Sequence, residues 1–499
     1  MASGAEIAAS IHINDCGAAS SRPIFVLMNS QTVLDIFKEI TRIPRESGHE
    51  APMTQWLLDW AAKHSLEAKK DDTGNVCIIR EASEGKENIP TLVLQAHQDM
   101  VCEKLPGSTH DFLHDPIDYV VEDGWMIAKE TTLGADDGIG IAAALALLES
   151  DDSTGRLECV FTISEETGMD GAEKMQSGFF TGKTLINLDS EDEGQMFIGC
   201  AGGETTEAEY NLTFSPLKAS RAIELRLSGG IGGHSGDDIS KGRANTVLLM
   251  LRFLYAHVGE YSLVSIDGGG KHNAIARDCA AVVCPKDETA FCDAFMAYGE
   301  ALKEEFHTTD PALVTEAVAL EDGEFALIDD LQAARMVASL YACPHGVLAM
   351  SQDIKDFVQT STNLASVHTA DGKIRVCTSQ RSSSAVECRA AAARVEAALS
   401  LGGAEVRHLN AYPGWEPNVD SEILKQCVVS YKKLFDKEPL VLAIHAGLEC
   451  GLFLEKFPGL DMISFGPTLR GVHAPGEKLE LDSLDKFTRH LEDVVVNFH

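Results

Sequence analysis

The sequence predicts an α/β fold: a three-layer domain with a mostly parallel sheet, interrupted by an inserted α+β domain. Short apolar runs, each ending in polar residues, alternate with segments of helical periodicity, and this pattern is typical of a parallel sheet covered by helices. A chain of 499 residues also exceeds the size at which a single hydrophobic core stops growing. Two or more domains are therefore expected.

Apolar runs predict the strands of this sheet, and the segments around them predict its helices. The patterns "TVLDIFKEITRI" and "MTQWLLDWAAKH" repeat apolar residues at helical spacing, so two amphipathic helices open the folded part. A third segment, "IGIAAALALLES", is apolar on almost every side and is expected to form a buried helix. The predicted strands are "TLVLQA" before His97, "LECVFTI" before Ser164, "TLINL" before Asp189 and "DMISF" before Gly466.

The character of the sequence changes along the chain, which indicates domain boundaries. Residues 1–29 are rich in Ala and Ser without sustained periodicity, and we interpret them as an N-terminal extension. Residues 30–203 and 413–499 carry the strands and helices of the three-layer domain. Residues 204–412 contain alternating strands such as "RAIELRLSGG" and helices such as "RANTVLLMLRFLYAHV", and are expected to form the inserted domain.

The charge balance excludes some classes of partner. With 41 Lys and Arg against 77 Asp and Glu, the net charge of −36 opposes binding to nucleic acid or anionic lipid. No apolar run reaches the roughly 18 to 20 residues of a membrane helix, and no basic segment leads into an apolar one near the N-terminus. The 13 cysteines include no Cys-x-x-Cys pair, which suits a reducing compartment. We expect a cytoplasmic protein with no nucleic-acid or membrane partner.

Histidine and carboxylate side chains gather where the predicted strands end. Functional groups of an open α/β sheet collect beyond the carboxyl ends of its strands, so segments distant in sequence converge on one crevice. Carboxylates and imidazoles without thiolates are ligands for zinc, manganese or cobalt, and enough are present for two ions that share a bridging carboxylate. The residues are His97 and Asp99, Asp136 and Asp137 in "TTLGADDGIG", Glu165 and Glu166, Asp189, and His473.

Each of these signals has an ordinary structural explanation when it stands alone. A His-x-Asp unit recurs often by chance, Asp136 or Asp137 could cap a helix, and Glu165 with Glu166 could form a solvated turn. Their joint occurrence, beside glycines that permit close backbone approach, favours a metal centre. The alternative is a simple acidic surface, which predicts no stoichiometric metal.

Motifs in order along the chain carry a family resemblance. They are "HQDMV", "TTLGADDGIGIA", "SEETGMDGA", "INLDSEDEG", "GGHSGDDI", "GRAN", "HAGLECGLF" and "GPTLRGVHAPGE". Together they resemble the aminoacylhistidine dipeptidases, the cytosolic non-specific dipeptidase type, within a clan of dinuclear metallopeptidases. The resemblance covers nearly all of the chain except the N-terminal extension. It implies a metal-dependent dipeptidase that hydrolyses unblocked dipeptides, including Xaa-His dipeptides.

The resemblance also implies a role for each residue of the constellation. Glu165 would be the general base that takes a proton from the attacking water held between two ions. Asp99 would orient His97 by accepting a hydrogen bond from its second ring nitrogen. The two divalent ions would be zinc, with manganese or cobalt as alternatives. Their ligands would be Asp136 as the bridge, His97 and Asp189 at one site, and Glu166 and His473 at the other.

The inserted domain contributes further residues by the same resemblance. His234 in "GIGGHSGDD" resembles the histidine of a lid domain that stabilises the oxyanion of the tetrahedral intermediate. Asn273 in "KHNAIAR" and Arg381 in "SQRSSS" resemble lid residues that bind substrate, and Arg381 suits a bidentate contact with a C-terminal carboxylate. Gly447 in "HAGLE" resembles a position that offers a backbone contact to substrate. The resemblance further implies a homodimer formed through the lid domain.

Other functions are compatible with part of the pattern. An aminoacylase or a carboxypeptidase of the same clan would use the same metals and base, but the "HAGLECG" segment and the long inserted domain favour the dipeptidase. A metal-binding but catalytically silent scaffold is the alternative outside enzymes. Such relatives normally lose the base or a ligand, whereas all of these positions are occupied here.

Overall fold

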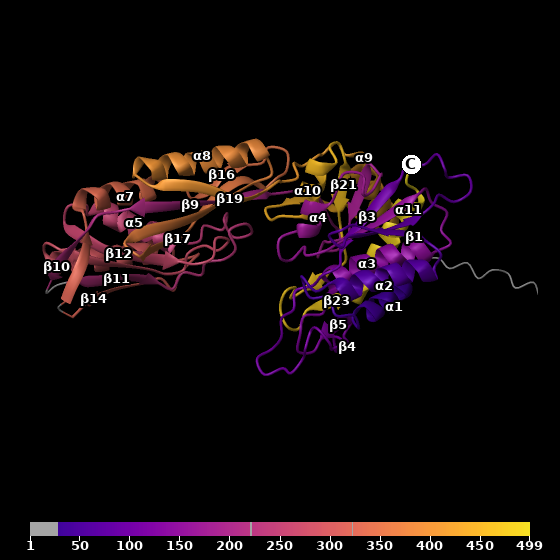
Figure 1. Cartoon of the computed structure of the whole chain (residues 1–499), viewed down its shortest axis with the longest axis horizontal. Coiled ribbons are helices and arrows are strands. Elements are labelled where there is room, and N and C mark those ends of the chain that lie inside the picture. Colours follow the sequence, from indigo (N-terminus) through magenta and orange to yellow (C-terminus); the bar gives the residue numbers. More distant parts are fainter. Residues whose placement is uncertain (1–27, 220–221, 322) are drawn as a thin grey trace, which may run out of the picture.

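Two large hydrophobic cores are present in the computed structural model, which describes residues 28–219, 222–321 and 323–499 (Figure 1). The first core combines residues from both ends of the chain with Ile354 and Phe357 from its middle, and the second lies within the middle. The predicted N-terminal extension lies outside the described residues except for Met28 and Asn29. Met28 is buried in the first core, and the Asn29 side chain accepts a hydrogen bond of 3.0 Å from the Thr32 N–H at the start of α1 (Ser30–Ile40). These two residues therefore belong to the folded part.

The first core surrounds a mixed sheet of eight strands. In chain order they are β1 (Glu67–Lys70), β2 (Val76–Arg80), β3 (Leu92–His97), β6 (Leu157–Thr162), β7 (Thr184–Asn187), β8 (Gln195–Cys200), β20 (Leu440–Ile444) and β21 (Asp461–Ser464). Their spatial order is β1-β2-β6-β3-β7-β21-β8-β20. The central strands β6, β3, β7 and β21 run parallel, as the sequence predicts. β1, β2 and β6 pair antiparallel, and β8 is antiparallel to β21 but parallel to β20.

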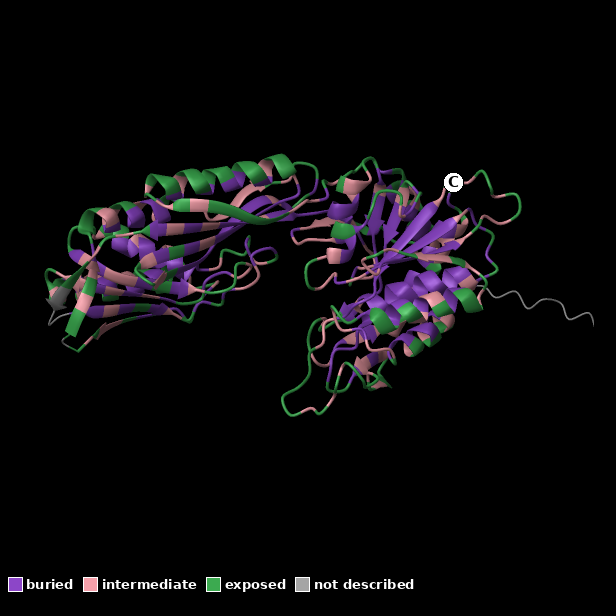
Figure 2. Cartoon of the chain, in the orientation of Figure 1, coloured by how far each residue is buried: buried purple, intermediate pink, exposed green. Residues whose placement is uncertain are grey.

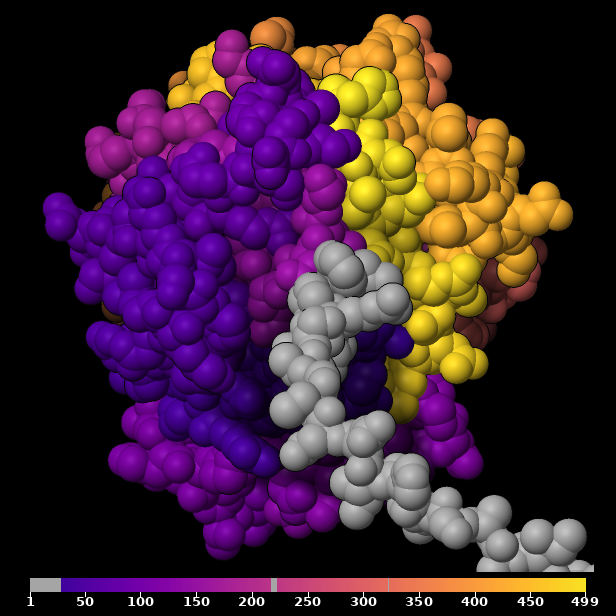
Figure 3. Space-filling model, turned by 90° about the vertical axis from the view of Figure 1, so that its right-hand side faces the viewer, coloured from indigo at the N-terminus to yellow at the C-terminus, as the bar shows by residue number. Residues whose placement is uncertain are grey.

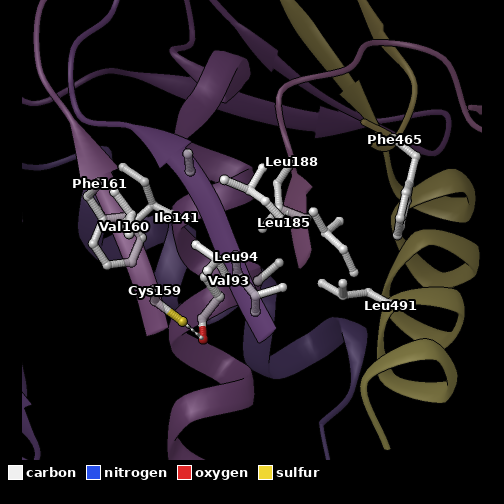
Figure 4. Packing of buried hydrophobic residues seen from close by; sticks show 14 of the residues in the cluster. Val93, Leu94, Ile141, Cys159, Val160, Phe161, Leu185, Leu188, Phe465 and Leu491 are labelled. Atoms are coloured by element: carbon white, nitrogen blue, oxygen red, sulfur yellow. Dashed lines mark hydrogen bonds between the residues drawn. The ribbon is translucent and has the colours of Figure 1, made fainter. Parts of the chain in front are cut away.

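Helices cover this sheet, so that its strands are largely buried (Figure 2). They are α1, α2 (Ala51–Lys63), α3 (Ala135–Glu149), α4 (Asp170–Lys174), α9 (Glu422–Phe435), α10 (Glu449–Lys456) and α11 (Leu481–Val496). α3 packs on β3 and β6 and is buried along almost its whole length, as its apolar sequence predicts. Figure 4 shows Ile141 of α3, Leu94 of β3, Val160 of β6 and Leu491 of α11 within one packed cluster. The domain has the three-layer α/β architecture predicted from the sequence.

The N-terminal and C-terminal helices of this domain lie side by side. α1 contacts α11, and the Ser30 hydroxyl donates a hydrogen bond of 3.0 Å to Oδ1 of Asp485. Figure 3 shows the first described residues (indigo) and the C-terminal segment (yellow) adjacent on one face of the molecule. The segments before and after the middle of the chain therefore complete a single core.

A small four-stranded sheet places two functional segments next to each other. It consists of β4 (Tyr119–Glu122), β5 (Trp125–Ala128), β22 (Leu469–Arg470) and β23 (Lys478–Glu480), in the spatial order β22-β23-β5-β4. β5 leads into the turn before α3, and β22 and β23 flank the turn that carries His473. His473 therefore does not follow the strand "DMISF" directly. β22 intervenes, and the chain reverses through positive φ values at Gly471 (69°) and His473 (62°).

The second core surrounds a nine-stranded sheet whose strand pairs are all antiparallel. Its strands are β9 (Gly202–Asn211), β11 (Ile223–Ser228), β12 (Tyr261–Gly269), β13 (Cys279–Pro285), β14 (Val314–Ala319), β16 (Gly346–Met350), β17 (Val358–Ala370), β18 (Lys373–Ser382) and β19 (Glu405–Tyr412). β10 (Phe214–Ala219) and β15 (Gly323–Ile328) form a separate pair, and the helices are α5 (Thr246–Ala256), α6 (Glu288–Glu305), α7 (Asp330–Ala342) and α8 (Ala385–Leu401). Among the helices that the structure describes, none has the length and apolar character of a membrane span.

The chain enters and leaves this second sheet through neighbouring strands. β9 and β19 pair with each other, and Gly203 lies opposite Tyr412. The boundaries expected from the sequence, 204 and 412, fall within β9 and at the end of β19. We therefore propose that residues 204–412 form one domain, inserted between residues 30–203 and 413–499 of the other.

Candidate metal centre

The carboxylate of Asp136 lies between two histidines from distant parts of the chain. Its Oδ1 is 2.9 Å from Nε2 of His97 at the end of β3, and its Oδ2 is 3.1 Å from Nε2 of His473. Nε2 of His473 is also 2.9 Å from Oε1 of Glu166, and Nε2 of His97 is 3.8 Å from Oδ1 of Asp189. Donor atoms of His97, Asp136 and Glu166 all lie within 4.8 Å of one another. The structure thus brings together the five side chains that the sequence proposes as ligands.

Asp137 belongs to a second group of nearby donor atoms. Donor atoms of His97, Asp137 and Asp189 also lie within 4.8 Å of one another. Both oxygens of Asp137 are engaged, however, because one accepts the His97 N–H and the other the Gly140 N–H, each at 3.2 Å. Asp137 therefore connects the start of α3 to the end of β3 through hydrogen bonds. Because both of its oxygens are used in this way, Asp136 is better placed to bind a cation. The peptide bond between the two aspartates is cis.

The acids of this cluster carry strongly shifted pKa values. Burial raises the pKa of Glu165 and of Asp189 well above the usual range, and the charge of Asp136 raises that of Asp189 further. For Asp136 itself, burial also acts to raise the pKa, but hydrogen bonds with His473 and His97 outweigh it and lower the pKa. Several acids with little access to water destabilise one another unless a cation compensates them. Imidazole and carboxylate donors without a thiolate fit a divalent ion such as zinc or manganese.

Asp99 is fully buried and contacts two parts of the centre. Its Oδ1 lies 3.3 Å from Nδ1 of His97, the ring nitrogen on the side away from Asp136. It also accepts the backbone N–H groups of Glu165 (3.0 Å) and Glu166 (3.2 Å) and the hydroxyl of Ser47 (2.8 Å). Burial acts to raise the pKa of Asp99, but the hydrogen bond and charge of His97 lower it to about 2. An ionised Asp99 can therefore orient the His97 ring and fix the turn of the two glutamates.

The two adjacent glutamates follow a sharp end of β6. The strand ends at Thr162, and Ser164 adopts a left-handed φ of 54°. The N–H and the hydroxyl of Ser164 both donate to Oε1 of Glu50 at 3.0 Å, which holds the chain in this turn. Because the strand has ended, its alternation no longer sends neighbouring side chains to opposite faces. Glu165 and Glu166 consequently line the same cavity.

This cavity, of about 530 Å³, is shared by the two domains. The first domain contributes the acids of the centre, His473 and Gly447, and the second contributes His234 and Asp237. Glu191 and Asp192, just beyond Asp189, line it as well. Groups from both domains can therefore contact one small molecule bound beside the cluster.

The remaining residues predicted in the second domain lie behind His234. Nη2 of Arg381 is 3.4 Å from Nε2 of His234, and Nη1 of Arg381 donates to the Tyr412 hydroxyl at 3.1 Å. Asn273 does not line the cavity, but its carbonyl accepts the Ser235 N–H at 2.8 Å and so fixes the segment that carries His234. Of the substrate-binding residues predicted, Gly447 thus lines the cavity, whereas Arg381 and Asn273 contact the His234 segment.

Some residues of the site were missed by the sequence analysis. Glu191 and Asp237 line the cavity, Glu477 accepts the backbone N–H of Asp136, and Arg45 donates to the carbonyl of Asp99. Three of the four stand within or beside the quoted motifs. No local pattern distinguishes them from surface residues, however, because their positions depend on contacts with distant segments.

Comparison with known proteins identifies the family of this site. The model of peptidase family M20/M25/M40 matches residues 93–497, which include every ligand candidate. The chain belongs to peptidase family M20/M25/M40. Membership of this family makes it a metal-dependent peptide hydrolase, in agreement with the cluster of histidine and carboxylate donors.

Individual proteins resemble the chain over nearly its full length. It is 35% identical over 474 residues to the cytosol non-specific dipeptidase of Escherichia coli (strain K12), covering 94% of this chain and 98% of that protein. The crystal structure of aminoacylhistidine dipeptidase from Vibrio alginolyticus matches with a TM-score of 0.88 and 36% identity, over 95% of this chain and 97% of that one. Aminopeptidase PepT from Bacillus cereus shares the fold, with a TM-score of 0.56, 16% identity and coverage of 94% and 98%.

We expect metal binding to release protons and to strengthen as pH rises. Hydrogen bonds with Asp136 and Glu166 raise the pKa of His473 to about 11 in the metal-free protein, so a cation that takes Nε2 must displace a proton at neutral pH. Isothermal titration with zinc or manganese in two buffers of different ionisation enthalpy would measure this release.

The raised pKa of His473 also makes the stability of the metal-free protein depend on pH. Because the pKa of His473 is raised on folding, its contribution to stability is fully present below the unfolded value of 6.5 and is lost as pH rises toward about 11.

A metal affinity independent of pH between about 6 and 8, with no proton release, would contradict the assignment of His473 as a ligand.

Proposed function

We propose that this chain is a dipeptidase that hydrolyses unblocked dipeptides, including Xaa-His dipeptides, with two divalent ions in the cluster around Asp136. The observation that carries the proposal is the contact of Asp136 with both His97 and His473, beside a cavity that receives groups from two domains. The names of the Escherichia coli and Vibrio alginolyticus relatives support the dipeptidase activity.

The two ions would be zinc, with manganese or cobalt as alternatives that accept the same ligands. Asp136 would be shared, because each of its oxygens faces a different histidine. His97 and Asp189 would complete one site, and Glu166 and His473 the other. When bound, such ions acidify water and polarise the scissile carbonyl.

Glu165 is placed to transfer the proton of the reaction. Its backbone N–H is fixed by Asp99, and its carboxylate lines the cavity beside Glu166. As general base it takes a proton from the attacking water and passes it to the leaving amine. His234 lines the same cavity and would donate a hydrogen bond to the oxyanion of the tetrahedral intermediate.

The cavity is suited to the charged ends of a free dipeptide. Glu191, Asp192 and Asp237 add negative charge beyond the ligand cluster, and no Lys or Arg is among the described residues that line it. Such a wall attracts an α-ammonium and gives a neutral N-acyl group no comparable contact, which favours a dipeptidase over an aminoacylase. Arg381, which is 7% exposed and next to His234, would bind the C-terminal carboxylate of the substrate.

The assembly and location of the protein are part of the same proposal. Homodimerisation through the inserted lid domain is supported by the exposed apolar side chains of Val386 and Leu401 on the outer face of α8. A cytoplasmic location is supported by the name of the Escherichia coli relative and by cysteines that are free throughout the described residues.

A substrate panel tests the proposed class. We expect the metal-loaded protein to hydrolyse a free dipeptide such as Ala-His with kcat/KM at least about tenfold above its N-acetylated form and above a tripeptide, because the blocked amine loses a charged contact. Release of free histidine measures cleavage of the Ala–His bond, and release of acetate measures removal of the acetyl group. Preference for the acetylated substrate with release of acetate would instead indicate an aminoacylase, and free histidine released from the acetylated substrate or from a tripeptide at a comparable rate would indicate a carboxypeptidase.

Replacing the general base separates an enzyme from a silent scaffold. Glu165→Gln keeps the size of the side chain but cannot accept the proton, so kcat should fall by about 10²- to 10⁴-fold. Metal content after dialysis, measured by mass spectrometry, should stay at the wild-type level. Unchanged turnover would exclude Glu165 as the base, and absence of activity in the wild-type protein would favour a scaffold.

The acidic wall has its own test in Glu191. Burial and the charge of Asp136 raise the pKa of Glu191 to about 7, although the charge of His473 acts to lower it. Glu191→Gln should lower kcat/KM for the free dipeptide about tenfold and leave kcat/KM for the acetylated dipeptide unchanged. The ratio of the two kcat/KM values therefore becomes smaller. Glu422→Gln, at an exposed acid on α9, is the matched control. An equal loss on both substrates would show that Glu191 does not contact the ammonium.

A further inference from the structure

Glu477 makes an unusual set of contacts with the turn that carries Asp136. Its side chain is almost completely buried, with 2% exposed. One oxygen accepts the N–H groups of Leu133 (2.7 Å) and Gly134 (3.0 Å), and the other accepts those of Ala135 (2.8 Å) and Asp136 (3.3 Å). A single carboxylate therefore binds four consecutive backbone N–H groups.

Arg45 binds the same turn at the carbonyl oxygen of Gly134. Its guanidinium, also 2% exposed, donates to the carbonyl of Gly134 and to those of Gln98 (3.0 Å) and Asp99 (2.6 Å) at the end of β3. Gly134 has a φ of 68°, and a Cβ there would lie 2.5 Å from Nη2 of Arg45, so the approach requires glycine. The guanidinium of Arg45 thus binds the Asp136 turn to the His97 strand, and the carboxylate of Glu477 binds the turn to the His473 hairpin.

These contacts connect the segments that carry the proposed ligands. Glu477 stands four residues after His473, in the turn between β22 and β23. Its hydrogen bonds fix the distance between that turn and the backbone of Asp136, whose carboxylate is 3.1 Å from the His473 ring. A ligand pair needs this distance to be held within a few tenths of an ångström, because metal–ligand lengths are short and narrowly distributed.

We propose that Glu477 is a positioning residue that sets the separation of Asp136 and His473 and thereby the affinity of the centre for its metal. This inference rests on the proposed metal centre and does not depend on which peptide is hydrolysed. In Glu477→Gln, one acceptor oxygen becomes an amide NH₂ that faces backbone N–H donors. The turn of Asp136 must then move away from the side chain at position 477, and the distance between Asp136 and His473 changes.

The chain contains a matched control in Glu158. This glutamate is fully buried near the start of β6, whereas Glu165 lies beyond the other end of the strand. It also binds consecutive backbone N–H groups, those of Thr181 (2.6 Å) and Gly182 (3.0 Å). Glu158→Gln therefore makes the same chemical change to a buried carboxylate far from the ligands.

The experiment measures metal affinity by competition between the full-length protein and a chelator, with zinc and with manganese. Circular dichroism and thermal unfolding of the metal-free proteins report folding. We expect Glu477→Gln to weaken metal binding about 10- to 100-fold, with kcat recovered at high metal concentration, whereas Glu158→Gln stays within about threefold of the wild type. The two substitutions should lower thermal stability to a similar extent.

Each other result counts against the proposal. A folded Glu477→Gln with wild-type metal affinity, or an equal loss of affinity in Glu158→Gln, overturns it. If Glu477→Gln does not fold, Glu477→Asp, which retains the charge, is measured instead; an affinity equal to that of the wild type then refutes the inference. Tight metal binding without dipeptide hydrolysis would refute only the proposed function, and a wild-type protein that binds no metal would refute both.

Discussion

The contact of one carboxylate, that of Asp136, with two histidines from distant parts of the chain is the constraint on which the rest of the structure depends. His97 comes from the end of the central strand β3, and His473 from a hairpin near the C-terminus. The His473 hairpin reaches Asp136 only because the C-terminal part returns to the domain begun by the N-terminal part. The pairing of β23 with β5 and of β21 with β7 provides that return.

Charge explains why the surroundings of this contact are so extensively hydrogen bonded. Acids placed beside one another with little water are unfavourable, and the pKa values of Glu165 and Asp189 are raised accordingly. The protein fixes the backbone around them with carboxylates that accept backbone N–H groups: Asp99 binds the glutamate turn, and Glu477 binds the turn of Asp136. A rigid frame of this kind holds the acids close enough to bind divalent ions, although they repel one another in the ions' absence.

The two-domain arrangement places groups from two sides around one cavity. The metal cluster belongs to one domain, and His234 reaches the same cavity from the other. The connections between the domains run through the paired strands β9 and β19, and the domains also contact each other between Ser361 and His445. The acids of the first domain line one side of this cavity and His234 and Asp237 line the other, with Arg381 in contact with His234.

The sequence by itself determined the elements and the chemistry of the site, because both are recorded locally. Apolar periodicity gave α1, α2, α3 and the central strands, since burial of one face or of all faces imposes that spacing on neighbouring residues. The sequence also indicated the chemical types of the proposed metal ligands, because carboxylates and imidazoles that occur together at strand ends favour a metal centre. The motifs extended this to a family, which the matching relatives bear out.

Only the tertiary structure decided which of these groups face one another. The family resemblance names Asp136 as the bridge, but Asp137 is adjacent and chemically identical, and the physical distinction comes from the hydrogen bonds of Asp137 to His97 and Gly140, which leave Asp136 to face both histidines. The placement of His473 on a separate hairpin, the burial of Glu477 and the approach of His234 to the cavity likewise depend on pairing between distant segments. Such contacts leave no local periodicity in the sequence, because each is set by the packing of the whole domain.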